Sequence, residues 1–467
     1  MTAKYCKRAG CLQRDSVERK EYVGAPNASR REGREKDGAD DLLERILNRD
    51  NLNSAYKQVK RNQGAPGIDG MTVEAALPWL RENKEKLLQS IRNGSFRPQP
   101  VRRKEIPKPD GGVRKLGIPT VVDRVIQQAI AQQLQPIYEP LFSDGSYAYR
   151  PRRSAQQAIC KVKEYAEQGY THVVEIDLSK YFDTLNHELL MNLLRQQIHD
   201  KRVTDLIKRY LKSGVMENGV TRKTKEGSPQ GGPISPLLAN IYLNEFDQEM
   251  ERRGVKVIRY ADDIIVLARS ERAAQHLLES SRKFLEGKLK LVLNTEKSKV
   301  VSIVARKNFK FLGFCLGKSG KGIFIRAHRK SLEKAKQKLK ELTSRSQGRN
   351  VRRVMEKVKV FIRGWLGYYY VAEIKRILRN WNEWLRRRFR MYIWKQWKKP
   401  KTKVANLGKL GIPEEQAYQW GNTRLGYWRI AGSAILHRSI TNEKLAQAGY
   451  YNFPAQYERL RKLHLCD

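Results

Sequence analysis

Apolar side chains change their spacing several times along this chain, and each spacing predicts one kind of secondary structure. Residues 42–56, 120–142 and 189–194 hold apolar positions three and four residues apart, as an amphipathic helix does. Residues 172–176 and 257–268 instead hold nearly continuous apolar runs in which β-branched residues are frequent, which is typical of buried strands. The pattern predicts an α+β fold in which helices precede and separate the strands.

The run 257–268, VIRYADDIIVLA, places two carboxylates side by side between apolar segments. Its pattern predicts a strand, a tight turn at Ala261-Asp262 and a second strand. Turn chemistry alone explains one aspartate, because Asp bonds its own backbone and tolerates turn dihedrals. Two carboxylates this close repel each other unless cations lie between them, so Asp262 and Asp263 are also candidate ligands for a divalent metal. A third carboxylate elsewhere would favour the metal site.

A candidate for that third carboxylate is Asp177, which ends the strand-like run 172–176. An aspartate here could simply cap the segment that follows. Tyr181 and Phe182 come shortly after it, and a large ring near a metal-binding carboxylate can form the floor of a sugar pocket or belong to the core. Both interpretations stay open on this segment alone.

Two basic segments are candidates for binding phosphate. KPDGG is a hairpin signal, and Lys108 and Arg114 flank it on strands whose neighbouring side chains can reach one anion. A solvated hairpin with edge lysines would look similar. Arg150, Arg152 and Arg153 precede a predicted helix, whose free N–H groups also favour anions.

Two glycine-rich loops interrupt the helical patterns. NQGAPGIDG, Asn62 to Gly70, is either a helix connection or a loop that lies over a ligand, since glycine allows close approach of the backbone. SPQGGP precedes an amphipathic pattern that continues to Asp247, and such a loop suits binding of phosphates or a base edge through backbone groups.

The charge of the chain narrows the class of partner. Its 467 residues include 93 Lys and Arg against 49 Asp and Glu, a net charge of +44 that favours a polyanion. No run of about 18 apolar residues occurs, and no apolar core follows the basic N-terminus, so neither a spanning helix nor a secretory signal is expected. Five scattered cysteines are expected to be reduced thiols. Together these features predict a cytoplasmic protein that binds nucleic acid and no membrane.

The C-terminal third is predicted to be helical and strongly basic. Residues 380–403 hold nine Lys or Arg against one Glu, interleaved with aromatic side chains. We expect the rings to pack a helix bundle and the cations to line its outer face. Residues 1–40 are polar and charged, which predicts a mobile basic leader.

Four blocks in order, IPKPDGGVRKLGIP, SYAYRPRRSAQQAI, SPQGGPISPLLANIYLNEFD and RYADD, resemble the reverse transcriptases of bacterial group II introns, as does NQGAPGIDG. The resemblance implies a right-hand polymerase. Its fingers and palm, with an antiparallel palm sheet, would span residues 41–325, and a helical thumb or maturase domain would span 326–450. A short tail, 451–467, would leave no room for the endonuclease domain of many relatives.

The same resemblance implies a role for each motif residue. Asp177, Asp262 and Asp263 would be the catalytic ligands of two Mg²⁺ ions. Lys108 and Arg114 would hold the incoming triphosphate. Gln230 would lie near the nucleotide, and Phe182 would exclude a 2′-hydroxyl.

The function implied is an RNA-directed DNA polymerase that is also a maturase for its host intron. Its partners would be group II intron RNA, an RNA template with a DNA primer, dNTPs and target DNA. Structured RNA would contact the basic helical face, at Arg386, Arg387, Arg388, Lys395, Lys398 and Lys399. Two alternatives are a splicing factor with a vestigial polymerase site and the reverse transcriptase of a retron or diversity-generating element.

Overall fold

The computed structural model describes residues 41–464 except 108–111, 180, 218–219, 223–225, 228–230 and 304–308. The predicted leader, Lys108 and Gln230 therefore lie outside the described residues. The described chain divides into two compact units, and the division falls between Phe309 and Lys310. Within the described chain, no helix has both the length and the apolar character needed to cross a bilayer.

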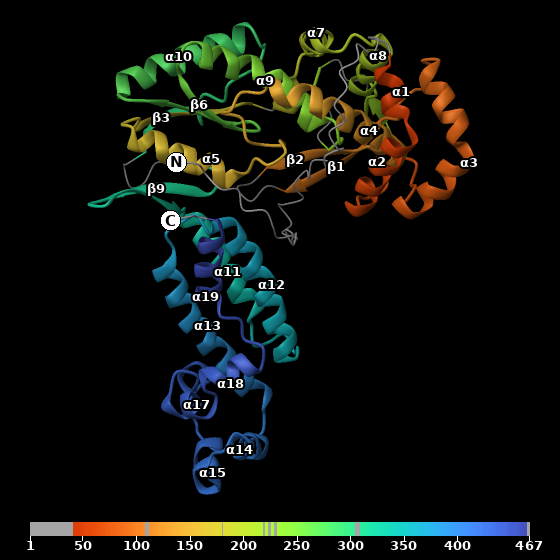
Figure 1. Cartoon of the computed structure of the whole chain (residues 1–467). Helices are drawn as coiled ribbons and strands as arrows, with labels where there is room; N and C mark the ends of the chain where they lie inside the picture. The colour runs from red at the N-terminus through yellow and green to blue at the C-terminus, as the bar shows by residue number, and fades with distance from the viewer. Residues whose placement is uncertain are drawn as a thin grey trace, which may run out of the picture. The chain divides into compact units, whose positions relative to one another are not determined.

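The first unit begins with helices that pack on one central helix (Figure 1). That helix, α4 (Val121–Tyr138), is buried over most of its length and contacts the three helices that precede it. Asn48 separates the first two of them, because its side chain accepts a hydrogen bond from Asp50 N at 2.9 Å and starts a new helix. The three helices are α1 (Leu42–Leu47), α2 (Arg49–Arg61) and α3 (Val73–Arg92).

The loop between α2 and α3 packs on protein atoms at two of its glycines. A Cβ on Gly67 would lie 2.6 Å from Thr120 Cα, and one on Gly64 would lie 2.2 Å from the Arg124 guanidinium. Arg124 Nη2 also donates to Ala65 O at 2.8 Å. Close packing on the start of α4 therefore explains why glycine occupies both positions.

The predicted basic hairpin is confirmed. Strand β1 (Val101–Pro107) pairs antiparallel with β2 (Val113–Ile118), with Ile106 opposite Arg114. A short second hairpin extends this sheet in the order β2-β1-β4-β5. Its strands are β4 (Val215–Glu217) and β5 (Val220–Arg222).

A second four-stranded sheet, which we call the central sheet, has the order β6-β7-β3-β8, and its neighbouring strands are all antiparallel. Its connections are β-α-β-β-α-β, in which α9 separates β3 from β6 and α10 separates β7 from β8. Helix α10 contacts β3, β7 and β8, while α9 and α5 contact β6 (Figure 1). The strands are β3 (His172–Asp177), β6 (Lys256–Tyr260), β7 (Asp263–Ala268) and β8 (Lys299–Ser302).

Helices complete the first unit around the central sheet. Their apolar faces join the strands in one continuous core. They are η1 (Glu139–Leu141), α5 (Ala155–Glu167), α6 (Tyr181–Thr184), α7 (His187–Gln197), α8 (Lys201–Leu211), α9 (Ser235–Arg252) and α10 (Glu271–Gly287).

The second unit opens with a hairpin, β9 (Phe314–Ser319) and β10 (Gly322–Ala327). This hairpin packs on helices of its own unit, since Phe314 stacks on Tyr368 and Glu373 N donates to Ile325 O at 2.7 Å. The second compact unit thus begins at Lys310 and includes this hairpin.

Four long helices form the body of the second unit, and aromatic rings such as Phe389 and Trp394 are buried in it. The rings of residues 380–403 therefore pack the bundle, as expected. The long helices are α11 (Arg329–Leu342), α12 (Val351–Tyr369), α13 (Lys375–Gln396) and α19 (Phe453–His464). The short ones are α14 (Pro400–Lys409), α15 (Glu414–Gly421), α16 (Tyr427–Ile430), α17 (Ala434–Ser439) and α18 (Asn442–Gln447).

Candidate functional site

The three predicted aspartates lie together at one end of the central sheet. Asp177 is the last residue of β3 and stands directly opposite Asp263, the first residue of β7. Tyr260 also pairs with Asp263, so Ala261 and Asp262 form the two-residue turn that the sequence predicted. The strands behind this end are buried, while Asp262 and Asp263 are exposed. Like charges directly opposite on paired strands repel, so this arrangement favours a bound cation.

The turn itself is held in an unusual backbone conformation. Ala261 has φ 59°, in the left-handed region that residues other than glycine seldom adopt, at a cost of about 1–2 kcal/mol. Arg259 Nη1 donates to Ala261 O at 3.2 Å from beneath the turn. A polar network within the core therefore fixes the turn that carries Asp262.

Arg259 is the centre of this network and is fully buried, with 0% of its side chain exposed. It forms an ion pair at 2.6 Å with Asp247, whose side chain is 3% exposed. It also donates to Asn240 Oδ1 and to Ser146 Oγ, both at 2.9 Å. A buried charge is stable only when it is paired and hydrogen-bonded. These partners of Arg259 come from α9, from the loop between α4 and α5 and from the turn itself. A charged residue in the apolar run VIRY was the signal in the sequence for this role.

Asp177 is held by a loop that follows α10. Ser298 Oγ accepts from Asp177 N at 3.1 Å, and Asn294 N donates to Asp177 O at 2.9 Å. Lys297 Nζ lies 3.6 Å from Asp177 Oδ2, with both side chains partly exposed. The sequence analysis did not identify Lys297, which places a positive charge beside the metal-ligand candidate.

The aspartates suit a magnesium ion that shares its ligands with a substrate. No group of three or more His, Cys, Asp or Glu among the described residues forms a ready-made metal cage. Mg²⁺ in phosphoryl-transfer sites is held by one or two carboxylates, and water and substrate phosphates complete its coordination. Three carboxylates that face solvent from one sheet end fit that chemistry.

Of the four predicted nucleotide contacts, the structure describes two. Arg114 is exposed on β2. Phe182 lies on α6, just after Asp177, and its partly buried ring meets Tyr181 edge-on at 5.1 Å between centroids. A Cβ on Gly227, which has φ 87°, would lie 2.7 Å from Phe182 O, so the loop before α9 packs against this backbone. The Phe182 ring thus packs against Tyr181, and its backbone packs against the loop before α9.

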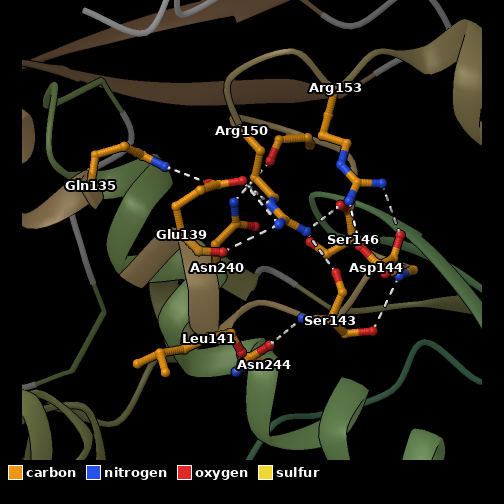
Figure 2. Close-up of polar contacts among 12 residues, drawn as sticks. Gln135, Glu139, Leu141, Ser143, Asp144, Ser146, Arg150, Arg153, Asn240 and Asn244 are labelled. Atoms are coloured by element: carbon orange, nitrogen blue, oxygen red, sulfur yellow. Dashed lines mark hydrogen bonds and ion pairs between the residues drawn. The ribbon is translucent and has the colours of Figure 1, made fainter. Parts of the chain in front are cut away.

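Arg150 and Arg153, expected to bind phosphate, have partners within the protein instead (Figure 2). Arg150 is buried and donates to Glu139 Oε1 at 2.9 Å and to Ser143 O at 2.6 Å. Arg153 bonds Asp144 and lies over the Tyr147 ring at 5.5 Å. The phosphate-site prediction is therefore wrong for Arg150, because its guanidinium ties the loop between α4 and α5 together.

Tyr149, in the same loop, is a residue that the sequence analysis did not identify. Desolvation raises the pKa of its phenol, and the Asp262 carboxylate raises it further, while Arg114 acts in the opposite direction and Asp263 in the same one. These interactions place Tyr149 among the charged groups of the candidate site. No feature of the sequence marks it, since its place depends on how two distant segments pair.

The six predicted RNA contacts in the second unit fall into two groups. Arg388 donates to Thr343 Oγ1 and to Lys340 O, and burial lowers its pKa. Arg387 donates to Trp428 O at 2.8 Å, and Arg386 is half-buried beside Tyr450. Lys395, Lys398 and Lys399 are exposed. The arginines are thus partly buried with polar partners inside the unit, whereas the three lysines are exposed, with Lys395 lying over the Tyr427 ring.

Next to Arg387 lies an exposed aromatic surface that the sequence analysis did not single out. Trp428 is 41% exposed, and the Arg387 guanidinium lies 4.1 Å from its ring centroid. Arg345 and Lys395 lie over the Tyr427 ring at 4.8 and 4.9 Å. Rings and cations presented together suit stacking on unpaired bases.

Two family models match the chain. Residues 106–316 match the reverse transcriptase (RNA-dependent DNA polymerase) model, and residues 332–411 match the group II intron, maturase-specific domain. The first match contains all three aspartates, strand β2 of the basic hairpin and the last two residues of β1. The second contains all of α13.

Two of the similar proteins come from bacteria. Protein YkfC of Escherichia coli is 36% identical over 312 residues, which cover 58% of this chain and 81% of YkfC. The group II intron-encoded protein LtrA of Lactococcus lactis is 37% identical over 262 residues, 56% of this chain and 42% of LtrA. The match therefore spans less than half the length of LtrA. A solved Cas6-RT-Cas1–Cas2 complex is 25% identical over 52% of this chain and 42% of that one, but its TM-score of 0.35 supports no structural argument.

Proposed function

Because this chain belongs to the group II intron-encoded reverse transcriptases and maturases, we propose that it copies RNA into DNA at the three-aspartate end of the central sheet. The observation that carries the proposal is the pairing of Asp177 with Asp263, with Asp262 on the adjoining turn. In this proposal the central sheet is the palm, and the β1–β2 hairpin belongs to the fingers. We assign residues 41–325 to fingers and palm and 326–450 to the thumb or maturase domain.

Two Mg²⁺ ions, when bound, would activate the primer 3′-hydroxyl and stabilise the charge that develops on the triphosphate. The protein contributes three carboxylates on a rigid support. Asp177 and Asp263 hold opposite positions on paired strands, and the Arg259 network holds the turn that carries Asp262. Rigid placement matters because phosphoryl transfer depends on in-line geometry more than on covalent chemistry by the protein.

We further propose that four residues select the nucleotide. Lys108 and Arg114 would bind the triphosphate from the β1–β2 hairpin, and Gln230 would lie near the nucleotide. Phe182 follows the strand that ends at Asp177, and the resemblance to reverse transcriptases implies that its ring would occupy the space that a 2′-hydroxyl needs.

The maturase activity would depend on the second unit. We propose that Lys395, Lys398 and Lys399 contact phosphates of the host intron RNA, because they are exposed on one helix and the segment that follows it. Arg386, Arg387 and Arg388 would mainly hold that surface in shape, since each has partners within the unit. We propose that the chain acts in the cytoplasm, on an RNA template with a DNA primer, on dNTPs and on target DNA.

Extension of a DNA primer on an RNA template with Mg²⁺ tests the polymerase proposal. We expect the purified chain to extend the primer and EDTA to abolish extension. Failure of the wild-type chain to extend any primer, in a preparation that still promotes intron splicing, would instead support a splicing factor with a vestigial polymerase site.

A further inference from the structure

The loop between α4 and α5 runs beside the strand that leads to the aspartate turn. Ser146 and Arg259 form a parallel bridge, with Tyr147 N donating to Arg259 O at 2.9 Å and Arg259 N to Gly145 O at 2.8 Å. Tyr149 lies three residues beyond this bridge on the loop, and Asp262 lies three residues beyond it on the other segment.

The Asn240 side chain forms hydrogen bonds to both segments. Asn240 Nδ2 donates to Ala148 O at 2.8 Å, and Asn240 Oδ1 accepts from Arg259 Nη1 at 2.9 Å. Arg259 Nη1 also donates to Ala261 O. The residue before Tyr149 and the residue before Asp262 are thus anchored to the same pair of side chains.

Tyr149 is exposed although its neighbours are buried. Its side chain is 37% exposed, whereas Ala148 and Arg150 are 1% and 6% exposed. Its φ of 58° is a left-handed value, which is a true outlier for a bulky residue. The Arg150 network shown in Figure 2 holds the loop in this conformation. A strained, exposed ring on a rigid support is the arrangement found at ligand sites.

We propose that Tyr149 binds the incoming nucleotide by donating a hydrogen bond from its phenol to the triphosphate. The groups that interact electrostatically with Tyr149 are Asp262, Arg114 and Asp263, which the proposed function assigns to the metal ions and the triphosphate. Tyr149 would then restrain the phosphates from the side of the α4–α5 loop. This inference rests on the proposed polymerase activity.

The test is Tyr149→Phe, which removes only the hydroxyl, with Tyr147→Phe as the matched control. Tyr147 lies in the same loop, but its ring contacts Arg153. A hydrogen bond to a charged group contributes about 1.5 kcal/mol or more, so the KM for dNTP should rise about tenfold in Tyr149→Phe. Its kcat should change less than about threefold, because the ring and the metal ligands remain. Tyr147→Phe should match the wild type.

Inorganic tripolyphosphate then identifies the part of the nucleotide that is bound. Its Ki as a competitor of dNTP should rise by the same factor in Tyr149→Phe, and thermal unfolding should be unchanged. An unchanged KM in an active Tyr149→Phe enzyme would overturn the inference alone. A raised KM with an unchanged Ki would overturn the triphosphate assignment. An inactive wild-type chain would overturn the proposed function and this inference with it.

Discussion

The aspartates at the end of the central sheet face solvent, and buried strands hold them in place. The arginines of α13, which the sequence predicted to be exposed, instead hold neighbouring segments together. Asp262 and Asp263 are exposed at the end of buried apolar strands, and the polar network next to them is centred on Arg259. On α13, Arg387 and Arg388 bond backbone and side-chain oxygens of neighbouring segments. The density of charge in a sequence therefore does not indicate which charges meet a ligand; the geometry of the element does.

The largest effect should come from removing the charge at the sheet end. Asp262→Asn with Asp263→Asn keeps side-chain size but removes the proposed metal ligands, so cDNA synthesis should fall by about three orders of magnitude or more, as loss of metal charge stabilisation implies. Intron splicing should persist, because the surface of the second unit is unchanged. Primer extension and splicing, measured side by side, test this division of labour.

The matched control is Glu188→Gln with Glu279→Gln, which removes equal charge from exposed positions of α7 and α10. Retained synthesis in the aspartate variant would refute the metal assignment. Lost splicing in that variant, with unchanged thermal unfolding, would show that the two regions are coupled.

The next effect concerns the buried support itself. Arg259→Met leaves the Asp247 carboxylate unpaired in the core, so the free energy of unfolding should fall by about 3–5 kcal/mol. Arg253→Met, which breaks an exposed pair with Glu249, should cost less than about 1 kcal/mol. Denaturant unfolding of both variants measures the difference. If both variants lose the same free energy of unfolding, the buried Arg259–Asp247 pair contributes no more to stability than the exposed pair.

A smaller effect is expected at Phe182, the proposed gate against a 2′-hydroxyl. Phe182→Ala should raise incorporation of ribonucleotides relative to deoxyribonucleotides about 10- to 100-fold, because 1–3 kcal/mol of steric discrimination is lost. Phe182→Tyr keeps the ring and should retain the wild-type ratio. Competition between rNTP and dNTP in single-nucleotide extension gives this ratio. An unchanged ratio in an active Phe182→Ala enzyme would exclude Phe182 as the gate.

The smallest effect should distinguish lysines from arginines on α13 and just beyond it. Replacing Lys395, Lys398 and Lys399 by Ala should reduce the slope of log K against log salt for intron RNA by about two to three, since each phosphate contact contributes about 0.7–0.9. Arg388→Met should leave that slope unchanged but lower the unfolding temperature, because its hydrogen bonds lie within the unit. A flatter slope in Arg388→Met than in the lysine variant would reverse our assignment.

The sequence predicted the strands, and the position of the aspartates at their ends, because strand patterns largely determine local geometry. In VIRYADDIIVLA the two apolar runs and the turn favour one hairpin register, with Tyr260 opposite Asp263, and the buried strand β3 pairs with β7 so that Asp177 also lies opposite Asp263. The roles of Arg150 and Arg388 were not accessible in this way. An arginine that binds a phosphate and an arginine that donates to a backbone carbonyl have the same local sequence pattern. Only tertiary packing determines which partner the guanidinium has.

Tyr149 was missed for a related reason. Its position depends on a parallel bridge between Ser146 and Arg259, and no local pattern specifies a pairing between an irregular loop and a strand edge. The compact boundary at Lys310 was also hidden, because the β9–β10 hairpin reads as a continuation of the preceding strands until its contacts with α12 are seen.

The polar network under the aspartate turn also has a consequence for how the protein is made. The hydrogen bond from Arg259 to Ser146 joins residues 113 apart in sequence, and the one from Asp177 to Ser298 joins residues 121 apart. Contacts of such separation form late in folding, because the entropy of closing long loops must be offset first. During synthesis, the basic β1–β2 hairpin leaves the ribosome long before Ser298 is added. The cations of the hairpin are therefore exposed before the proposed aspartate site is complete.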